Sequence, residues 1–95
     1  MGIGVITTIV AKPGYEQEVE EALREVVPPS RIDDGCEFYA LNRDFKRPSA
    51  FYILEQWRDQ EAISRREEQS HFKRLIEALE GKIESMEAAR LETLL

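Results

Sequence analysis

The segment Ala50 to Arg58 constrains the fold of this chain most, because it predicts a β-strand that is apolar on both sides. Side chains along a strand alternate between its two faces. Phe51, Ile53 and Trp57 therefore share one face, and Tyr52 and Leu54 share the other. A sheet built around such a strand must be covered on both faces, since an uncovered face would leave a large apolar patch in water.

The first third of the chain predicts a strand and then a helix. Ile3 to Ala11 is mostly β-branched and apolar, which is typical of a strand buried on both faces. From Tyr15 onward, apolar residues recur at the spacing of one helical stripe, with glutamates on the opposite side. Pro28-Pro29 is expected to end this helix, because proline lacks the N–H that a helix interior uses.

The middle of the chain predicts a hairpin followed by two helices. Cys36 to Arg43 has strand character and is expected to pair with Ala50 to Arg58 across a short turn. Asp59 suits the N-cap of a short, highly charged helix. Ser70 suits the N-cap of a longer helix, which Gly81 would end.

The last segment, Glu84 to Leu95, is ambiguous, because its propensities favour a helix while its apolar spacing also permits a strand. A strand there would complete the order β-α-β-β-α-β, a ferredoxin-like α+β fold with a four-stranded antiparallel sheet. The helices of that fold cover only one face of the sheet. The two-faced strand therefore predicts a homodimer that packs sheet to sheet about a two-fold axis.

Size and charge exclude several classes of partner. The 95 residues are expected to form one domain over 1–95. Lys and Arg number 13 against 19 for Asp and Glu, and the net charge of −6 disfavours nucleic acid and anionic membrane surfaces. No apolar run approaches the roughly 20 residues that span a bilayer, and the N-terminus lacks the order of a secretory signal. We therefore expect a cytoplasmic protein.

Metal and disulfide chemistry are limited by the scarcity of suitable side chains. Cys36 is the only cysteine and His71 the only histidine. One chain therefore cannot form an internal disulfide or assemble the His and Cys ligands of a zinc site. No metal is expected.

Short motifs recur in a fixed order along nearly the whole chain. They are Lys12-Pro13-Gly14 before an acidic helix, Gly35-Cys36 with Tyr39 and Leu41, Asp44 and Pro48 in the hairpin loop, Phe51 and Ile53 before Glu55-Gln56-Trp57, Ala62, and Ser70-His71-Phe72-Lys73. In this order they resemble the antibiotic biosynthesis monooxygenase (ABM) family of the dimeric α/β barrel superfamily. The resemblance implies ferredoxin-like homodimers whose last strand associates with the partner subunit, and it predicts that Glu84 to Leu95 is a strand.

The resemblance also implies a cofactor-independent monooxygenase, which oxidises a small aromatic, quinol or polyketide-like substrate with O₂. Some family members degrade haem, but the asparagine and the haem-ligating histidine of those members correspond here to Thr7 and Ile76. Haem is therefore not expected. The strand asparagine of the polyketide oxygenases corresponds to Ile53, so this chain departs from them as well.

Two residues are expected to be catalytic. His71 lies at the start of a predicted helix, where a neutral imidazole could accept a phenolic proton; capping the helix or packing at the subunit interface is the alternative role. Trp57 offers a flat wall and one N–H donor, or else closes the core. Three residues are expected to bind substrate or to serve in packing: Tyr39, Asn42 and Phe72.

Two charged features are interpreted as structural. Glu55 shares the strand face of Trp57 and is expected to form an ion pair with an arginine. The run Arg65-Arg66-Glu67-Glu68 is interpreted as a solvated helix face.

Two other functions stay open. The same pocket could serve an isomerase or another proton-transfer enzyme, or it could belong to a non-enzymatic module that binds a hydrophobic ligand. Only the monooxygenase would consume O₂ in proportion to its substrate. A pocket of Trp, Phe, Tyr and Ile accepts many flat molecules, so no residue identifies the substrate.

Overall fold

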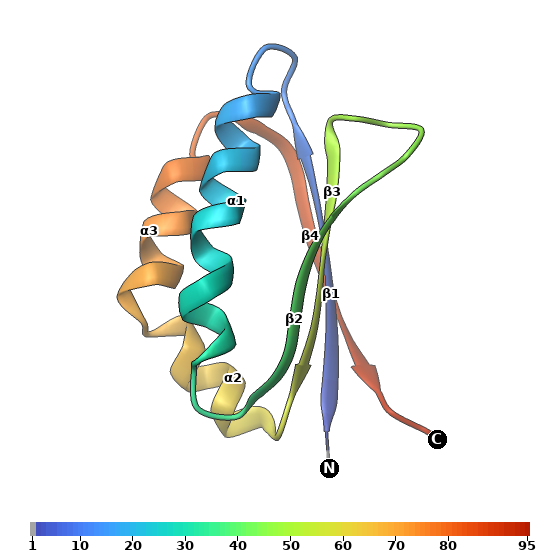
Figure 1. Ribbon diagram of the computed structural model, residues 1–95, viewed down its shortest axis with the longest axis vertical. Coiled ribbons are helices and arrows are strands. Elements are labelled where there is room, and N and C mark those ends of the chain that lie inside the picture. Colours follow the sequence, from blue (N-terminus) through green and yellow to red (C-terminus); the bar gives the residue numbers. More distant parts are fainter. Residues whose placement is uncertain (1) are drawn as a thin grey trace.

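A four-stranded antiparallel sheet forms one layer of the computed structural model, which describes residues 2–95, and three helices form the other layer (Figure 1). The elements are β1 (Ile3–Ala11), α1 (Glu16–Arg31), β2 (Cys36–Arg43), β3 (Ala50–Trp57), α2 (Gln60–Glu67), α3 (Ser70–Leu79) and β4 (Ile83–Glu92). The strand order β2-β3-β1-β4 confirms the ferredoxin-like α+β fold. None of the helices within residues 2–95 combines the length and the apolar character of a membrane span.

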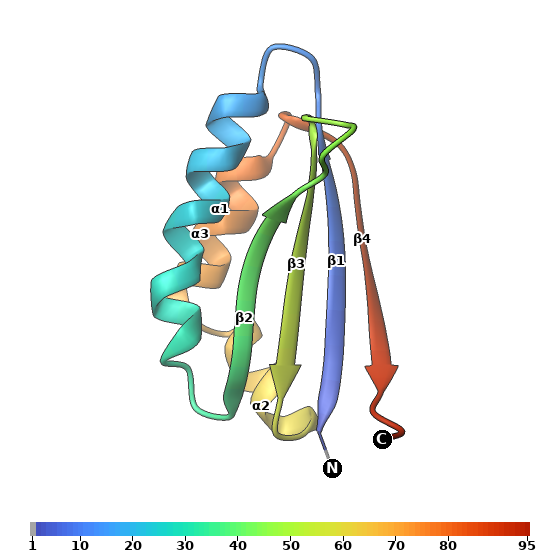
Figure 2. The same cartoon turned by 45° about the vertical axis from the view of Figure 1, so that its right-hand side comes forward.

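Strand β1 occupies the middle of the sheet, with β3 on one side and β4 on the other. Its register with β3 places Ile3 opposite Trp57 and Ile9 opposite Phe51. Figures 1 and 2 show all three helices on one side of the sheet. Strands β2 and β4 form the two edges of the sheet. We call the face toward the helices the inner face and the opposite one the outer face.

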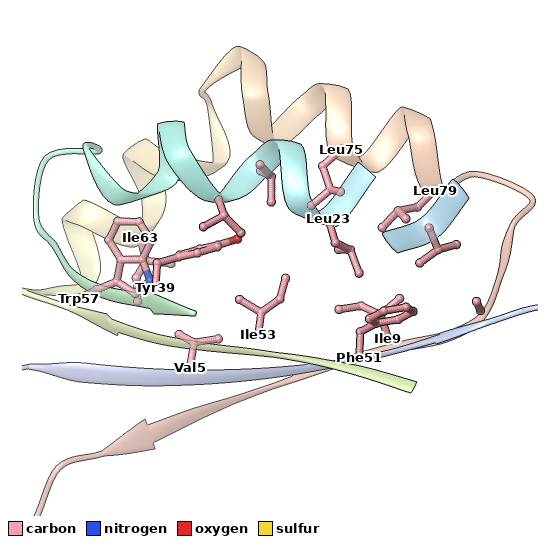
Figure 3. Close-up of a cluster of buried hydrophobic side chains, with 14 of the residues drawn as sticks. Val5, Ile9, Leu23, Tyr39, Phe51, Ile53, Trp57, Ile63, Leu75 and Leu79 are labelled. Atoms are coloured by element: carbon pink, nitrogen blue, oxygen red, sulfur yellow. The ribbon is translucent and has the colours of Figure 1, made fainter. Parts of the chain in front are cut away.

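The core fills the space between the inner face and the helices (Figure 3). Phe51 and Trp57 of β3 are fully buried there, which confirms the face predicted for them. Side chains of α1 and α3 pack onto them from above, among them Leu23 and Leu75. The inner face of the central strands β1 and β3 is thus covered within the single chain.

Helix α1 continues through Pro28 and Pro29 to Arg31, so the prediction that the prolines end it is wrong. The backbone angle of proline is compatible with a helix, and what is lost is the hydrogen bond to the carbonyl four residues earlier. Those carbonyls belong to Arg24 and Glu25, which are exposed and accessible to water. Burial of Val26, Val27 and Ser30 holds the last turn in place, and the Ser30 hydroxyl donates to the Val26 carbonyl over 2.6 Å.

Two of the three residues predicted to begin or end α2 and α3 lie where they were predicted. Asp59 caps α2, and its carboxylate accepts the Ala62 N–H over 2.9 Å. Gly81 follows α3 with a φ of +78°, a conformation that glycine adopts without steric cost. Ser70 is the first helical residue, whereas Gln69 has the extended backbone of the N-cap, so the predicted cap is wrong by one residue.

The ambiguous last segment is a strand, as the resemblance predicted. β4 pairs with β1 along its whole length, with Thr7 opposite Ala88. All its residues after Ile83 are exposed, so neither face of this edge strand is covered by the chain's own helices.

The outer face of the sheet carries apolar side chains that contact water. Phe38, Leu54 and Leu91 are 54%, 38% and 49% exposed, and they lie on β2, β3 and β4 respectively. Their strand registers place them on the face opposite Trp57. The fold therefore leaves the outer face uncovered, and homodimerisation through it stays a prediction.

Candidate functional site

A buried carboxylate lies beside Trp57 at the end of β3. The indole Nε1–H of Trp57 donates to Oε1 of Glu55 over 2.6 Å, and the same oxygen lies 3.4 Å from Nη2 of Arg66 in α2. The Glu55 side chain is 1% exposed and that of Arg66 is 11% exposed. The pair therefore lies in the interior, which confirms the expected ion pair between Glu55 and an arginine.

Arg66 also contacts two aromatic rings. Its guanidinium carbon lies 5.5 Å from the ring centroid of Trp57 and 4.6 Å from that of Phe72, within the range of cation–π attraction. The interpretation of the run that contains Arg66 as a solvated helix face is wrong at this residue. Arg66 follows Ala62 by one helical turn and thus shares its buried side, a spacing that is visible in the sequence.

Burial disfavours ionisation throughout this region. It raises the pKa of Glu55, against the opposing effects of Arg66 and Trp57. It also raises the pKa of Tyr39 to about 12 and shifts the pKa of the Cys36 thiol upward. Neither the phenol nor the thiol is therefore prepared to act as an anionic nucleophile near neutral pH.

His71 belongs to a second, separate pair. It is the second residue of α3, and its Nε2 lies 2.9 Å from Oδ2 of Asp33 in the loop between α1 and β2. Both side chains are largely buried, at 13% and 10% exposure. Because a carboxylate can only accept, Nε2–H is the donor of this pair, and Nδ1 is the ring nitrogen left for another partner.

His71 lines a groove of about 230 Å³ between α1 and α3. The apolar part of its wall comes from Ala22, Val26, Pro29, Leu75 and Ala78, and the polar part from Glu25 and Arg74. A histidine held by a carboxylate beside an apolar wall is an arrangement that can accept a proton from a weak acid, and Arg74 and Glu25 add one charge of each sign to the same groove.

The other predicted site residues lie elsewhere. Tyr39 is buried in the core on the inner face, close to Trp57 in Figure 3. Asn42 is exposed near the end of β2, opposite Tyr52 in the register, and its Nδ2 approaches the Ala40 carbonyl at 3.5 Å. The structure thus brings Trp57 and Phe72 together through Arg66, places His71 beside Phe72 in α3, and leaves Asn42 apart.

Two residues that contact the predicted site residues were not predicted from the sequence: Asp33 and Arg66. Asp33 lies in a polar loop 38 positions before His71, and nothing local predicts that they meet. Arg66 lies in a run of four charged residues, and its spacing from the buried Ala62 is the signal that could have identified it. Among residues 2–95, no three His, Cys, Asp or Glu side chains lie together as a metal site would require.

The chain matches the model of the family described as antibiotic biosynthesis monooxygenase over residues 2–78. No functionally curated protein matches it closely enough to count as a relative.

Solved structures resemble it over their whole length. A structure of PA3566 from Pseudomonas aeruginosa is 35% identical with a TM-score of 0.96, and the match covers 99% of this chain and 95% of that one. A structure called an antibiotic biosynthesis monooxygenase is 26% identical with a TM-score of 0.91, covering 98% and 99% of the two chains. Rv0793 from Mycobacterium tuberculosis shares the fold at 18% identity, with a TM-score of 0.93 and coverage of 99% and 96%. The solved structures share the fold, and the family model, which matches most of the chain, shows that the chain belongs to the antibiotic biosynthesis monooxygenase family.

Proposed function

We propose that this protein is a cofactor-independent monooxygenase that oxidises a small electron-rich phenol or quinol with O₂, with His71 as the catalytic base. The observation that carries the proposal is the pair formed by His71 and Asp33 at the edge of the groove between α1 and α3. Family membership supports the reaction class.

In the proposed reaction, Nδ1 of His71 accepts the phenolic proton while Asp33 holds Nε2–H. The phenolate passes one electron to O₂, and the resulting radical pair recombines at a ring carbon to form a peroxide. Loss of water then leaves a quinone. The O–H and C–H hydrogens of the phenol leave in that water, one atom of O₂ remains in the quinone, and the substrate supplies every electron.

Arg74 lines the same groove and would stabilise the phenolate. The wall of Val26, Leu75 and their neighbours would hold the ring and exclude water from the anion. The groove volume of about 230 Å³ limits the substrate to a small molecule. Tyr39 and Asn42 are not needed for binding in this arrangement.

We assign Trp57 a positioning role in place of direct contact with substrate. Trp57 is fully buried, and its N–H is engaged by Glu55. Arg66 bridges Trp57 to Phe72, the residue after His71. The buried cluster therefore fixes the start of α3, and with it the imidazole that α3 carries.

We also propose that the functional unit is a homodimer formed through the outer face. The exposed Phe38, Leu54 and Leu91 supply the apolar surface, and the uncovered β4 supplies an edge strand that a partner can cover.

Oxygen uptake by chelator-treated protein, measured against a panel of phenols and hydroquinones, tests the reaction. His71→Ala is expected to lower kcat by at least about a hundredfold, the usual contribution of a positioned base. Lys73→Ala, an exposed change in the same helix, serves as the control and should leave kcat unchanged. If His71→Ala turns substrate over as fast as the unaltered protein, His71 is not the base.

The two rival functions give different results in the same assay. An isomerase would convert its substrate without O₂ uptake. A binding module would bind several phenols and turn over none.

A further inference from the structure

A second groove lies on the other side of α1, between this helix and strands β2 and β3. Its volume is about 300 Å³, at the lower end of the range for small-molecule sites. Pro28 lines this groove, whereas Pro29 lines the groove beside His71. The two grooves are therefore separated by the body of α1.

The floor of this second groove is apolar. It is formed by Val27 and Pro28 from α1, Leu41 from β2 and Phe51 from β3. Phe51 is almost fully buried, so only part of its ring borders the groove. Such a floor suits a flat hydrocarbon ring.

The rim is rich in arginine. Arg24, Arg31 and Arg43 line the groove, and Glu20 is its only carboxylate. An excess of positive charge is unusual in a chain whose net charge is −6. The groove therefore attracts anions where most of the surface repels them.

The three arginines are engaged to different degrees. Arg24 Nε lies 2.8 Å from Oε2 of Glu20, and Arg43 pairs with the other oxygen of the same carboxylate. Hydrogen bonds from Arg24 and then Arg43 lower the pKa of Glu20, which therefore stays ionised at neutral pH. One carboxylate cannot neutralise both guanidinium groups.

Arg31 differs from Arg24 and Arg43 in that it is not paired with a carboxylate of the described residues. Its Nε donates to the Tyr39 carbonyl over 3.0 Å, and within residues 2–95 no carboxylate forms an ion pair with it. The hydrogen bond orients the guanidinium and leaves its two Nη groups to donate elsewhere. A guanidinium held in this way binds a carboxylate through two parallel hydrogen bonds.

The position of other charges sets the orientation of a ligand. Glu16 and Glu21 line the adjoining surface toward the N-terminus of α1. They would repel an anion placed at that end. The anionic group of a ligand is therefore expected at the Arg31 end of the groove, with its ring against Pro28 and Leu41.

From these observations we propose that the groove between α1 and the β2–β3 hairpin binds a small aromatic carboxylate. The proposal concerns binding alone and does not depend on oxygenation at His71. Asn42 also borders this groove, but its register opposite Tyr52 places its side chain on the outer face, so it adds no side-chain contact there.

Titration of the ¹⁵N-labelled protein with sodium benzoate, followed by amide chemical shifts, tests the proposal. Benzoate is expected to cause saturable shifts in Val27, Leu41 and Arg43. Benzyl alcohol carries the ring without the charge, and sodium acetate carries the charge without the ring. Each should bind at least about tenfold more weakly than benzoate, because each loses one of the two contributions.

Two substitutions locate the anion. Arg31→Gln should weaken benzoate binding about tenfold and leaves the pairs of Glu20 intact, whereas Arg43→Gln should weaken it less, because Arg43 is already paired with Glu20. Arg47→Gln removes an exposed arginine of the hairpin loop and should leave the affinity unchanged. Benzoate shifts centred on His71 and Arg74, equal affinity for benzyl alcohol, or undiminished binding by Arg31→Gln would each overturn the proposal.

Discussion

His71 Nε2 lies 2.9 Å from Asp33 Oδ2, and this contact joins the start of α3 to the loop that follows α1. The two residues are 38 positions apart in the sequence. Because Asp33 accepts from Nε2–H, Nδ1 is the ring nitrogen left free to face a substrate.

This contact predicts that Asp33→Asn impairs turnover without abolishing binding. The amide can still accept from Nε2–H, but it can also rotate to present its NH₂ group and leave the imidazole in the wrong tautomer. We expect kcat for a turned-over phenol to fall at least about tenfold while KM changes little.

Asp34→Asn provides the matched control. Asp34 is the adjacent carboxylate, but its side chain is 72% exposed and it pairs with Arg58 and Arg65. Equal effects of the two substitutions on kcat would show that Asp33 acts only through the loop and not through His71.

The ion pair between Glu55 and Arg66 predicts a large loss of stability when one partner is removed. Arg66→Met keeps much of the side-chain volume but leaves a buried carboxylate without its cation, and should cost about 3–5 kcal/mol in the free energy of unfolding. Urea denaturation measures this. Arg65→Gln, which breaks only exposed pairs, should cost less than about 1 kcal/mol.

The buried phenol of Tyr39 predicts a late step in an alkaline titration. Its folded-state pKa of about 12 lies above the ordinary tyrosine pKa of 10.0, so the unfolded chain releases this proton first. The stabilising contribution of the neutral phenol is therefore lost as pH rises from 10 toward 12. Absorbance of tyrosinate in Tyr39→Phe should lack the last step of the titration, and the variant should lose less stability over this interval.

The outer face predicts that one charged substitution dissociates the dimer. Leu54→Glu places a carboxylate in the middle of the apolar surface, and light scattering at micromolar concentration should then report 11.0 kDa. The unaltered protein should report twice that mass. Ile32→Glu, at an apolar residue of the α1–β2 loop that is more exposed, should stay dimeric; a monomeric unaltered protein would contradict the prediction.

The fold could be predicted where local patterns and tertiary packing agree. The alternating faces of β3 and the cap at Asp59 are local features, and both are confirmed. The continuation of α1 past Pro28 could not be predicted, because burial of Val26, Val27 and Ser30 outweighs two missing hydrogen bonds. The strand at β4 required the family resemblance, since its own propensities favour a helix.

The candidate site was less predictable than the fold. His71 and Trp57 stand out because each is the only residue of its type in the chain. Their partners depend on the tertiary structure: Asp33 reaches His71 from a distant loop, and Arg66 reaches Glu55 from another element. A single sequence shows the chemical type of each side chain, but the fold decides which of them meet.

The most direct measurement of the central claim is the O₂ consumed per phenol oxidised by chelator-treated protein, with catalase added at the end. A monooxygenase that sends one oxygen atom into the quinone and the other into water consumes one O₂ per substrate and releases no peroxide. Catalase should then return no O₂. Recovery of half the consumed O₂ would show that the protein releases hydrogen peroxide as an oxidase does, and would contradict the account.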